Sequence, residues 1–317
     1  MRETGASTPP IPITQSPIAQ TIDLLGDRLT LSILRYAFVD HAHRFTQWIE
    51  RTGAPPAMLT ARLSALVTAG LMERRGHPNG SDRHDYLLTE LGLATWEILA
   101  SVWAWEREWS PAGLTEPELV HTGCGHRGPP VVMCRHCGRV VGTRDTRVEL
   151  DLESLILAAR SGRRRSTRSA GPQSRADLQF AEVMEAIGDR WSALVTGLAL
   201  SGVRRFGEFQ SILKVSPTTL TDRLGRLCDV AILSRGEADG SRVYALTPRG
   251  RALFSIFVFL LSWTQTAHPH ALSLGPILRH RGCGCFLIPA LQCRGCEATL
   301  ERTAVHFEPF PFDRSSR

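Results

Sequence analysis

The chain has 317 residues, 43% of them hydrophobic, so its composition excludes a wholly disordered protein and suggests two domains of about 150 residues each. The formal net charge is +6 and the sequence pI is about 9.1, a balance that is compatible with a polyanionic partner. The most apolar stretch, residues 252–263, is too short for a membrane span, which needs about 20 residues, and the start of the chain lacks the apolar segment of a signal peptide. We therefore expect a cytoplasmic protein with no membrane partner, in which clustered cysteines bind metal rather than form disulfides.

The sequence contains an internal repeat. Leu-Gly-Asp-Arg at 25–28 recurs as Ile-Gly-Asp-Arg at 187–190, and Leu-Thr-Ala-Arg-Leu at 59–63 recurs as Leu-Thr-Asp-Arg-Leu at 220–224. Three cysteines of the first half, Cys124, Cys134 and Cys137, recur as Cys283, Cys293 and Cys296. Because the offset between the copies changes by only a few residues along the whole unit, the chain is a tandem duplication.

The repeat divides the chain into seven expected segments. In order, they are a disordered tail (1–16), a first winged-helix domain (17–112), a first zinc element (113–145), a helix end with an arginine-rich linker (146–177), a second winged-helix domain (178–270), a second zinc element (271–312) and a short tail (313–317).

The first unit is expected to contain three helices, a two-stranded hairpin that turns at 77–80, and a tryptophan-rich last helix. Its third helix starts with Ala-Pro-Pro-Ala-Met at 54–58, which offers few polar groups. The candidate contacts of this unit with a polyanionic partner are two residues of the third helix and two of the hairpin: Thr60, Arg62, Arg74 and Arg83.

A cysteine element follows the first unit. Its spacing, Cys-x-His-x7-Cys-x-x-Cys, predicts four ligands for one zinc ion: Cys124, His126, Cys134 and Cys137. His121 precedes the first cysteine by three residues and is an alternative ligand, although four ligands without it favour a supporting role.

Six arginines and no acidic residue occupy the stretch from 160 to 176 between the copies. This composition predicts either a solvated linker or a basic strap along DNA phosphates. A flexible linker of this length spans on the order of 20–25 Å, so the two copies can pair within one chain.

The second unit shows the same pattern more clearly. Apolar spacing predicts one helix over 180–200 and a short second helix over 206–213. Ser216 and Pro217 begin a third helix that runs to about residue 231. Strands at 232–235 and 242–246 flank an Asp-Gly turn, and a last helix spans 249–265. The expected fold is mainly α with small β wings: two winged helix-turn-helix domains, each with a C-terminal zinc-binding knuckle.

Several motifs of the second unit resemble those of the HxlR-type winged-helix regulators. They are Gly-Asp-Arg-Trp at 188–191, Arg-Phe-Gly-Glu-Phe at 205–209, Ser-Pro-Thr-Thr-Leu-Thr-Asp-Arg-Leu at 216–224, and Arg-Val-Tyr-Ala-Leu-Thr-Pro-Arg-Gly at 242–250. The resemblance covers about 85 residues in each copy. It implies a bacterial transcriptional regulator whose outer helices pair two units, here either as an intrachain pseudo-dimer or as a homodimer.

In such an architecture the third helix enters the major groove and the wing touches the backbone. The candidate DNA contacts of the second unit are its helix-three hydroxyls and arginine and two wing arginines: Ser216, Thr218, Thr219, Thr221, Arg223, Arg235 and Arg242. Arg62 and Arg223 occupy the same position in the two copies, so they equally suit a structural ion pair, for example between Arg223 and Glu208. The first unit has fewer polar groups at this helix, and we expect the second unit to be the better reader of DNA.

The second cysteine element predicts a second zinc site, formed by Cys283, Cys285, Cys293 and Cys296. His280 repeats the position of His121. Cysteine and histidine are interchangeable as zinc ligands but not as disulfide partners, so zinc is favoured over a disulfide. Cys228 lies on the third helix and suits a small core residue.

The leading hypothesis is therefore a DNA-binding regulator with two structural zinc ions and double-stranded DNA as its partner. No motif of an enzyme is present. Two alternatives remain open: a zinc-stabilised protein-interaction module, and a regulator that senses thiol oxidation.

Overall fold

The computed structural model describes residues 16–76, 84–111, 117–149, 180–269 and 275–308. The first copy consists of α1 (Pro17–Leu25), α2 (Arg28–Val39), α3 (Phe45–Thr52), α4 (Pro56–Thr68), β1 (Met72–Gly76), β2 (His84–Leu88), α5 (Glu90–Leu93), α6 (Trp96–Trp109), β3 (Glu118–His121), β4 (Val131–Cys134) and β5 (Thr146–Glu149). The second copy consists of α9 (Ala181–Ile187), α10 (Arg190–Leu200), α11 (Phe206–Leu213), α12 (Pro217–Asp229), β6 (Leu233–Ala238), β7 (Ser241–Leu246), α13 (Pro248–Ala252), α14 (Phe254–Ala267), β8 (Ile277–His280), β9 (Pro289–Gln292) and β10 (Val305–Glu308). The expected order of helices and wings is confirmed, and so is the fold class of two mainly α winged helix-turn-helix units with small β wings.

Two helices that the sequence predicts as continuous are each divided. The helix expected over 180–200 becomes α9 and α10, because the Asp189 carboxylate accepts the backbone N–H groups of Trp191 and Ser192 and starts a new helix. The last helix divides at Leu253 into α13 and α14. The Gly-Asp-Arg motif thus marks a helix boundary in each copy, since Asp27 caps α2 in the same way.

The wing of the second copy is a tight hairpin. β6 pairs antiparallel with β7, and the turn between Ala238 and Ser241 consists of Asp239 and Gly240, both with positive φ. This is the conformation of a type I′ turn, for which an Asp-Gly pair is well suited. In the first copy β1 pairs with β2 in the same way, while the expected turn at 77–80 lies outside the described residues.

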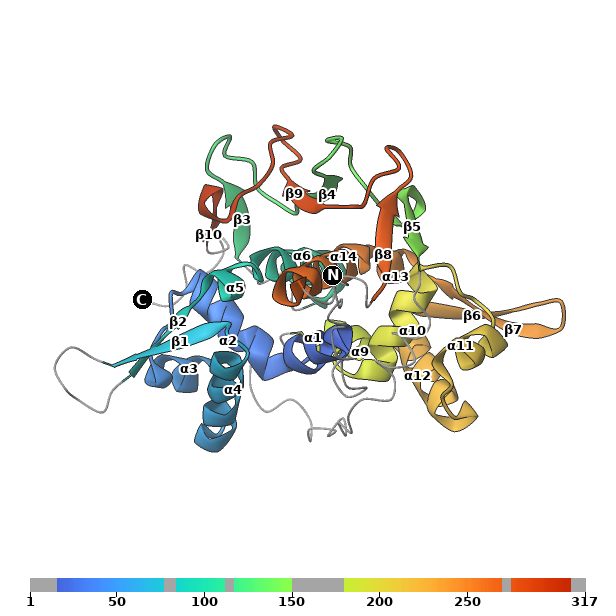
Figure 1. Ribbon diagram of the computed structural model, residues 1–317, viewed down its shortest axis with the longest axis horizontal. Coiled ribbons are helices and arrows are strands. Elements are labelled where there is room, and N and C mark those ends of the chain that lie inside the picture. The colour runs from blue at the N-terminus through green and yellow to red at the C-terminus, as the bar shows by residue number, and fades with distance from the viewer. Residues whose placement is uncertain (1–15, 77–83, 112–116, 150–179, 270–274, 309–317) are drawn as a thin grey trace, which may run out of the picture.

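The two copies pack against each other through their last long helices, α6 and α14 (Figure 1). The Trp105 indole N–H donates to the carbonyl oxygen of Arg249 at 3.0 Å, and the Trp263 indole N–H donates to that of Leu91 at 3.1 Å. Each tryptophan occupies the same position in its copy, and so does each carbonyl, so the contact is reciprocal. Buried apolar residues of both copies form one continuous core.

Beyond these helices, the cysteine elements of the two copies exchange strands. β3 of the first copy pairs with β10 of the second, β5 pairs with β8, and β4 pairs with β9 at the centre, all antiparallel. Val131 lies opposite Gln292 and Met133 opposite Ala290, a register that places an approximate twofold axis between β4 and β9. The result is one layer of strands built from both copies, which covers one side of the helices (Figure 1).

On the opposite side of the molecule lie α4 and α12, the third helices of the two helix-turn-helix units (Figure 1). The wings β1–β2 and β6–β7 extend at the two ends. Among the described residues, no helix is both long and apolar enough to cross a membrane. The fold therefore presents two matched helices on one face and the cysteine layer on the other.

Candidate nucleic-acid interface and metal centres

The recognition helix of the second copy, α12, begins with a hydroxyl cap. Ser216 Oγ accepts the backbone N–H of Thr219 at 3.2 Å and lies 2.9 Å from Thr219 Oγ1. Two of the predicted contacts therefore already interact with each other, and they hold the first turn of the helix. Thr218 and Thr221 are exposed, and among the described residues neither hydroxyl has a partner of the kind that joins Ser216 to Thr219.

The two equivalent arginines have a structural role in both copies. Arg223 Nε lies 3.2 Å from Asp189 Oδ1, and its side chain is only 15% exposed. Arg62 donates to Asp27 Oδ2 at 2.8 Å. Each arginine thus joins the recognition helix to the aspartate that caps the second helix of the unit, α2 or α10. The alternative partner considered for Arg223, Glu208, instead accepts the backbone N–H groups of Arg204 and Arg205, which lowers the pKa of its carboxyl.

The first copy offers a less polar helix. Pro55 occupies the cap position of α4 and provides no side-chain hydrogen bond. Thr60 Oγ1 donates to the carbonyl of Pro56 at 2.9 Å, and Met58 is 53% exposed. The surface of α4 is thus less polar than that of α12, as the sequences of the two helices indicate.

The wing arginines are exposed. Arg74 on β1 lies 3.0 Å from His84 Nδ1, and Arg235 and Arg242 lie on β6 and β7. Arg83 lies outside the described residues. Sequence reasoning passed over Lys214, which is exposed at the turn between α11 and α12 with φ of 51°. Its place in the turn of the helix-turn-helix is the feature from which this contact could have been predicted.

Two groups of four ligand-type side chains lie in the strand layer, and each draws on both copies. The first consists of His121 and Cys124 from the first copy with Cys293 and Cys296 from the second; the other consists of Cys134 and Cys137 from the first with His280 and Cys283 from the second. In each group all four ligand atoms lie within 4.8 Å of one another. We refer to these groups as the His121 cluster and the His280 cluster.

The distances within the clusters suit a tetrahedral ion. In the His121 cluster, His121 Nδ1 lies 3.2 Å from Cys124 Sγ and 3.4 Å from Cys296 Sγ, and the sulfurs of Cys124 and Cys293 are 3.6 Å apart. In the other cluster, His280 Nδ1 lies 3.3 Å from the sulfurs of both Cys137 and Cys283. Zinc bonds of about 2.3 Å to sulfur and ~2.0 Å to nitrogen give tetrahedron edges of roughly 3.5–3.8 Å. The spacing is also far above the ~2.05 Å of a disulfide bond.

One thiol of the His280 cluster has a lowered pKa. The pKa of Cys283 is lowered to about 6, because the backbone N–H of Cys285 and the side chains of His280, Cys137 and Cys134 donate to its sulfur. The thiolate is the form that binds metal. Three cysteines and one histidine form an ordinary structural zinc set, so the residues fit Zn²⁺.

The ligand sets differ from the two expected within single copies. The structure brings neither His126 nor Cys285 into a cluster, and it separates Cys124 from Cys134 and Cys137. His126 and Cys285 instead accept, through their carbonyl oxygens, the backbone N–H groups of His121 and His280, each at 3.0 Å.

The physical reason for this correction is the exchange of strands. Pairing of β3 with β10 and of β5 with β8 carries each His-x-x-Cys turn to the Cys-x-x-Cys turn of the other copy. The histidine three residues before the first cysteine then completes the set. Cys228, the remaining cysteine, lies on α12, half-buried and packed against the core, as expected.

Two winged helix-turn-helix units with their third helices on one face define a protein of the DNA-binding regulator class. The HxlR-like helix-turn-helix family model matches residues 24–113 and 186–271, more than half of the chain, and the chain belongs to this family. The strand layer with both clusters lies outside the two matched segments.

Similar proteins are named as regulators and not as enzymes. Uncharacterized HTH-type transcriptional regulators of Mycobacterium bovis and of two strains of Mycobacterium tuberculosis are each 34% identical to this chain over 133 residues. The match covers 42% of this chain and 84% of each relative, so a relative has the length of a single copy. No solved structure matches the chain significantly.

Proposed function

We propose that this protein is a cytoplasmic transcriptional regulator that binds double-stranded DNA as an intrachain pseudo-dimer. The observation that carries the proposal is the position of α4 and α12 on one face of a chain whose two units pack reciprocally through Trp105 and Trp263. Winged-helix units presented as such a pair suit two half-sites of one operator. Within this chain the pairing needs no second subunit, so the active species is a monomer.

The second unit is proposed as the stronger reader of DNA. On α12 the exposed Thr218 and Thr221 offer hydroxyls to bases or phosphates, and Lys214 lies at the preceding turn. On α4 the exposed side chains include Met58 and Thr60. We assign the wing arginines, Arg74, Arg235 and Arg242, to phosphate contacts, as well as Arg83 by analogy. Arg62 and Arg223 are assigned a positioning role, because each is engaged by a capping aspartate.

The two clusters are proposed to hold one structural Zn²⁺ each. The ligands are the side chains of the His121 cluster and of the His280 cluster, three sulfurs and one nitrogen in each. Zinc in such a closed set supplies a cross-link and no open position for catalysis. Because each set takes two ligands from each copy, metal binding joins the units and fixes the distance between α4 and α12.

Selection of bound fragments from randomised DNA, followed by titration of the recovered sequence at several salt concentrations, tests the proposed function. We expect a pseudo-palindrome with unequal half-sites and affinity that falls steeply with salt. A Thr218→Ala/Thr221→Ala variant is expected to weaken binding by about tenfold, on the scale of 1–3 kcal/mol for a specific contact. Thr60→Ala in α4 is the matched change in the first unit, where Ala57 already stands at the position of Thr218, and it is expected to have a smaller effect. Failure to enrich any sequence would leave the chain as a protein-interaction module and refute the proposal.

A further inference from the structure

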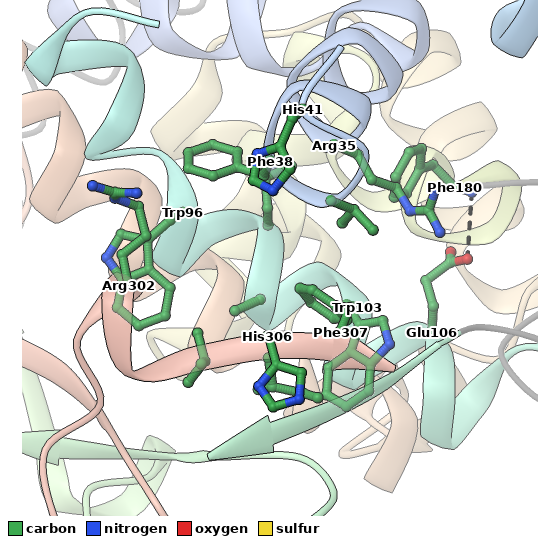
Figure 2. A pocket seen from close by; sticks show the side chains of 15 residues that line it. Arg35, Phe38, His41, Trp96, Trp103, Glu106, Phe180, Arg302, His306 and Phe307 are labelled. Atoms are coloured by element: carbon green, nitrogen blue, oxygen red, sulfur yellow. Dashed lines mark hydrogen bonds between the residues drawn. The ribbon is translucent and has the colours of Figure 1, made fainter. Parts of the chain in front are cut away.

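A cavity of about 180 Å³ lies between the two copies, beneath the strand layer (Figure 2). Its walls come from α2 and α6 of the first copy, from Phe180 at the start of the second copy, and from the segment 302–307 near the end of the second copy. An occupant would therefore touch both units at once. For comparison, an apolar protein cavity of roughly 150 Å³ is large enough to bind benzene.

The walls of this cavity are aromatic. Phe38 faces it from α2, Trp96 and Trp103 from α6, and Phe307 from β10 (Figure 2). Trp103 and Phe307 meet edge to face with ring centroids 5.6 Å apart, and the Trp103 indole N–H donates to the carbonyl of Pro117 at 2.9 Å. The rings are thus held in place before any ligand enters. Such walls suit a flat ring system, which gains from stacked and edge-to-face contacts.

Basic groups outnumber acidic ones around the cavity. Arg302 and His306 line it from the strand layer, and Arg35 and His41 from the side of α2. Among the described residues that line the cavity, Glu106 is the only acid.

The acid and two of the basic groups, Arg35 and His306, already have structural partners. Glu106 accepts the backbone N–H of Phe180 at 3.3 Å, a contact that ties the second copy to α6 (Figure 2). His306 lies 3.0 Å from Glu308. Arg302 is exposed and forms no ion pair with any carboxylate in the described part of the chain. The charge at the mouth of the cavity therefore favours an anion.

The duplication supplies an internal comparison. The equivalent place in the second copy also holds a cavity, but it is smaller, about 80 Å³, and it is lined mainly by aliphatic residues and phenylalanines. Where the first cavity has Trp103, the second has Leu261. Where the first has Arg35, the second has Gly197.

Uncharged residues of the second cavity also replace the charged residues at the mouth and at the inner end of the first. Thr143 occupies the position of Arg302, and Thr264 occupies that of Glu106. The scaffold of the two cavities is shared, so the charged and indole side chains of the first are not required to build it. They are specific to one site.

We propose that the first cavity is the effector site of the protein, and that it binds one planar aromatic carboxylate per chain, with the rings between Trp96, Trp103 and Phe307 and the carboxylate at Arg302. The consequence for DNA rests on the proposed function: a ligand held between both units changes their relative position and thereby the affinity for the operator. Binding of the ligand itself does not depend on DNA.

Isothermal titration of the full metal-loaded chain with 2-naphthoate tests the proposal without DNA. We expect one binding event per chain, and at least fivefold weaker binding of the neutral 2-naphthamide and of the non-aromatic cyclohexanecarboxylate. Arg302→Thr, which installs the residue of the second copy at an exposed position, is expected to weaken 2-naphthoate about fivefold or more, equivalent to ~1 kcal/mol. Trp103→Leu is expected to weaken the binding of 2-naphthoate more than Arg302→Thr does.

Arg147→Ala is the matched control. Arg147 is an exposed arginine in the other half of the strand layer, where it occupies the position that His306 has beside the first cavity. This variant is expected to leave binding unchanged. The proposal is overturned if 2-naphthoate does not bind at millimolar concentration, if the amide or 2-naphthylmethylammonium binds as tightly, or if Arg302→Thr behaves like Arg147→Ala. Two binding events per chain also overturn it, since the second cavity would then be equivalent. A change in operator affinity on adding 2-naphthoate is measured separately, so failure of DNA binding does not affect the result for the ligand.

Discussion

Glu97 makes the stability of the chain depend on pH. It lies on α6 near the backbone of Leu291 on β9, and its Oε1 atom is buried without a hydrogen-bond partner among the residues that the structure describes. The pKa of this carboxyl is raised from 4.5 to about 7, because burial disfavours the charged form; the nearby Arg135 opposes the shift and Glu301 adds to it. Glu97 is therefore a group whose ionisation destabilises the contact between helix and strand layer.

The sign and the size follow from linkage. A carboxyl whose pKa is higher in the folded state binds its proton more tightly there, so the free energy of unfolding falls as pH rises from 4.5 to 7 and stays lower above pH 7. A shift of this size corresponds to about 3 kcal/mol at most, and partial exposure to solvent reduces it to about 2 kcal/mol. Glu97→Gln keeps a neutral group at every pH. Its advantage over the wild type is expected to grow by about 2 kcal/mol between pH 5 and pH 8.

Urea unfolding of the metal-loaded wild type and of Glu97→Gln at the two pH values measures this difference, and effects of pH on other groups cancel in the comparison. Glu108→Gln removes a carboxylate from an exposed position of the same helix and controls for the loss of charge. An advantage of Glu97→Gln that is equal at pH 5 and pH 8 would show that burial of the charge does not destabilise the fold, and would refute the reasoning.

Two further predictions concern the joints between elements. Asp189→Asn removes the charge that holds Arg223 and is expected to destabilise the second unit by about 2–3 kcal/mol, which is less than the 3–5 kcal/mol of a fully buried pair. Thermal or urea unfolding measures this loss. A loss under about 0.5 kcal/mol would exclude the positioning role of Arg223. Trp263→Phe leaves the carbonyl of Leu91 without its indole partner and is expected to lower stability by about 1 kcal/mol. Trp109→Phe is the matched control, because the buried Trp109 indole N–H has no partner among the described residues, so equal losses for the two variants would contradict the reciprocal contact.

The helix-turn-helix units were predictable because their signals are local. Apolar spacing, the hydroxyl of Ser216 before Pro217 and the Asp-Gly turn each determine structure within a few residues. The same local reasoning failed at Asp189, where a cap inside an apolar run divides one helix into two. The Gly188-Asp189 pair could have indicated this helix boundary, because an aspartate after a glycine is suited to begin a new helix.

The metal sets were less predictable because they depend on strand pairing between residues more than 120 positions apart. Spacing along the chain identifies pairs of ligands but not which pairs meet, and the presence of His126 in one copy where Cys285 stands in the other suggested a set within each copy. The repeated histidines, His121 and His280, carried the better signal, since each stands three residues before a cysteine, the separation found in Cys-x-x-Cys.

The arginines of the recognition helices illustrate a similar limit. Their shared position in the two copies was compatible with both DNA contact and an ion pair. Only the packing of α12 against α10 brings Arg223 to Asp189 rather than to Glu208. Repetition of a residue in both copies indicates that the residue is needed, but it does not distinguish a contact with DNA from an ion pair within the fold.

The central claim, that metal sites shared between the copies join the two DNA-binding units, is tested most directly by counting zinc in two double variants by native mass spectrometry. Cys134→Ser/Cys283→Ser alters two ligands of the His280 cluster and is expected to retain one zinc. Cys124→Ser/Cys134→Ser alters one ligand in each cluster and is expected to retain none. Both variants lose two cysteines, so each controls for the other. The reverse result, one zinc in the second variant and none in the first, would show that each copy binds its own metal and would contradict the account.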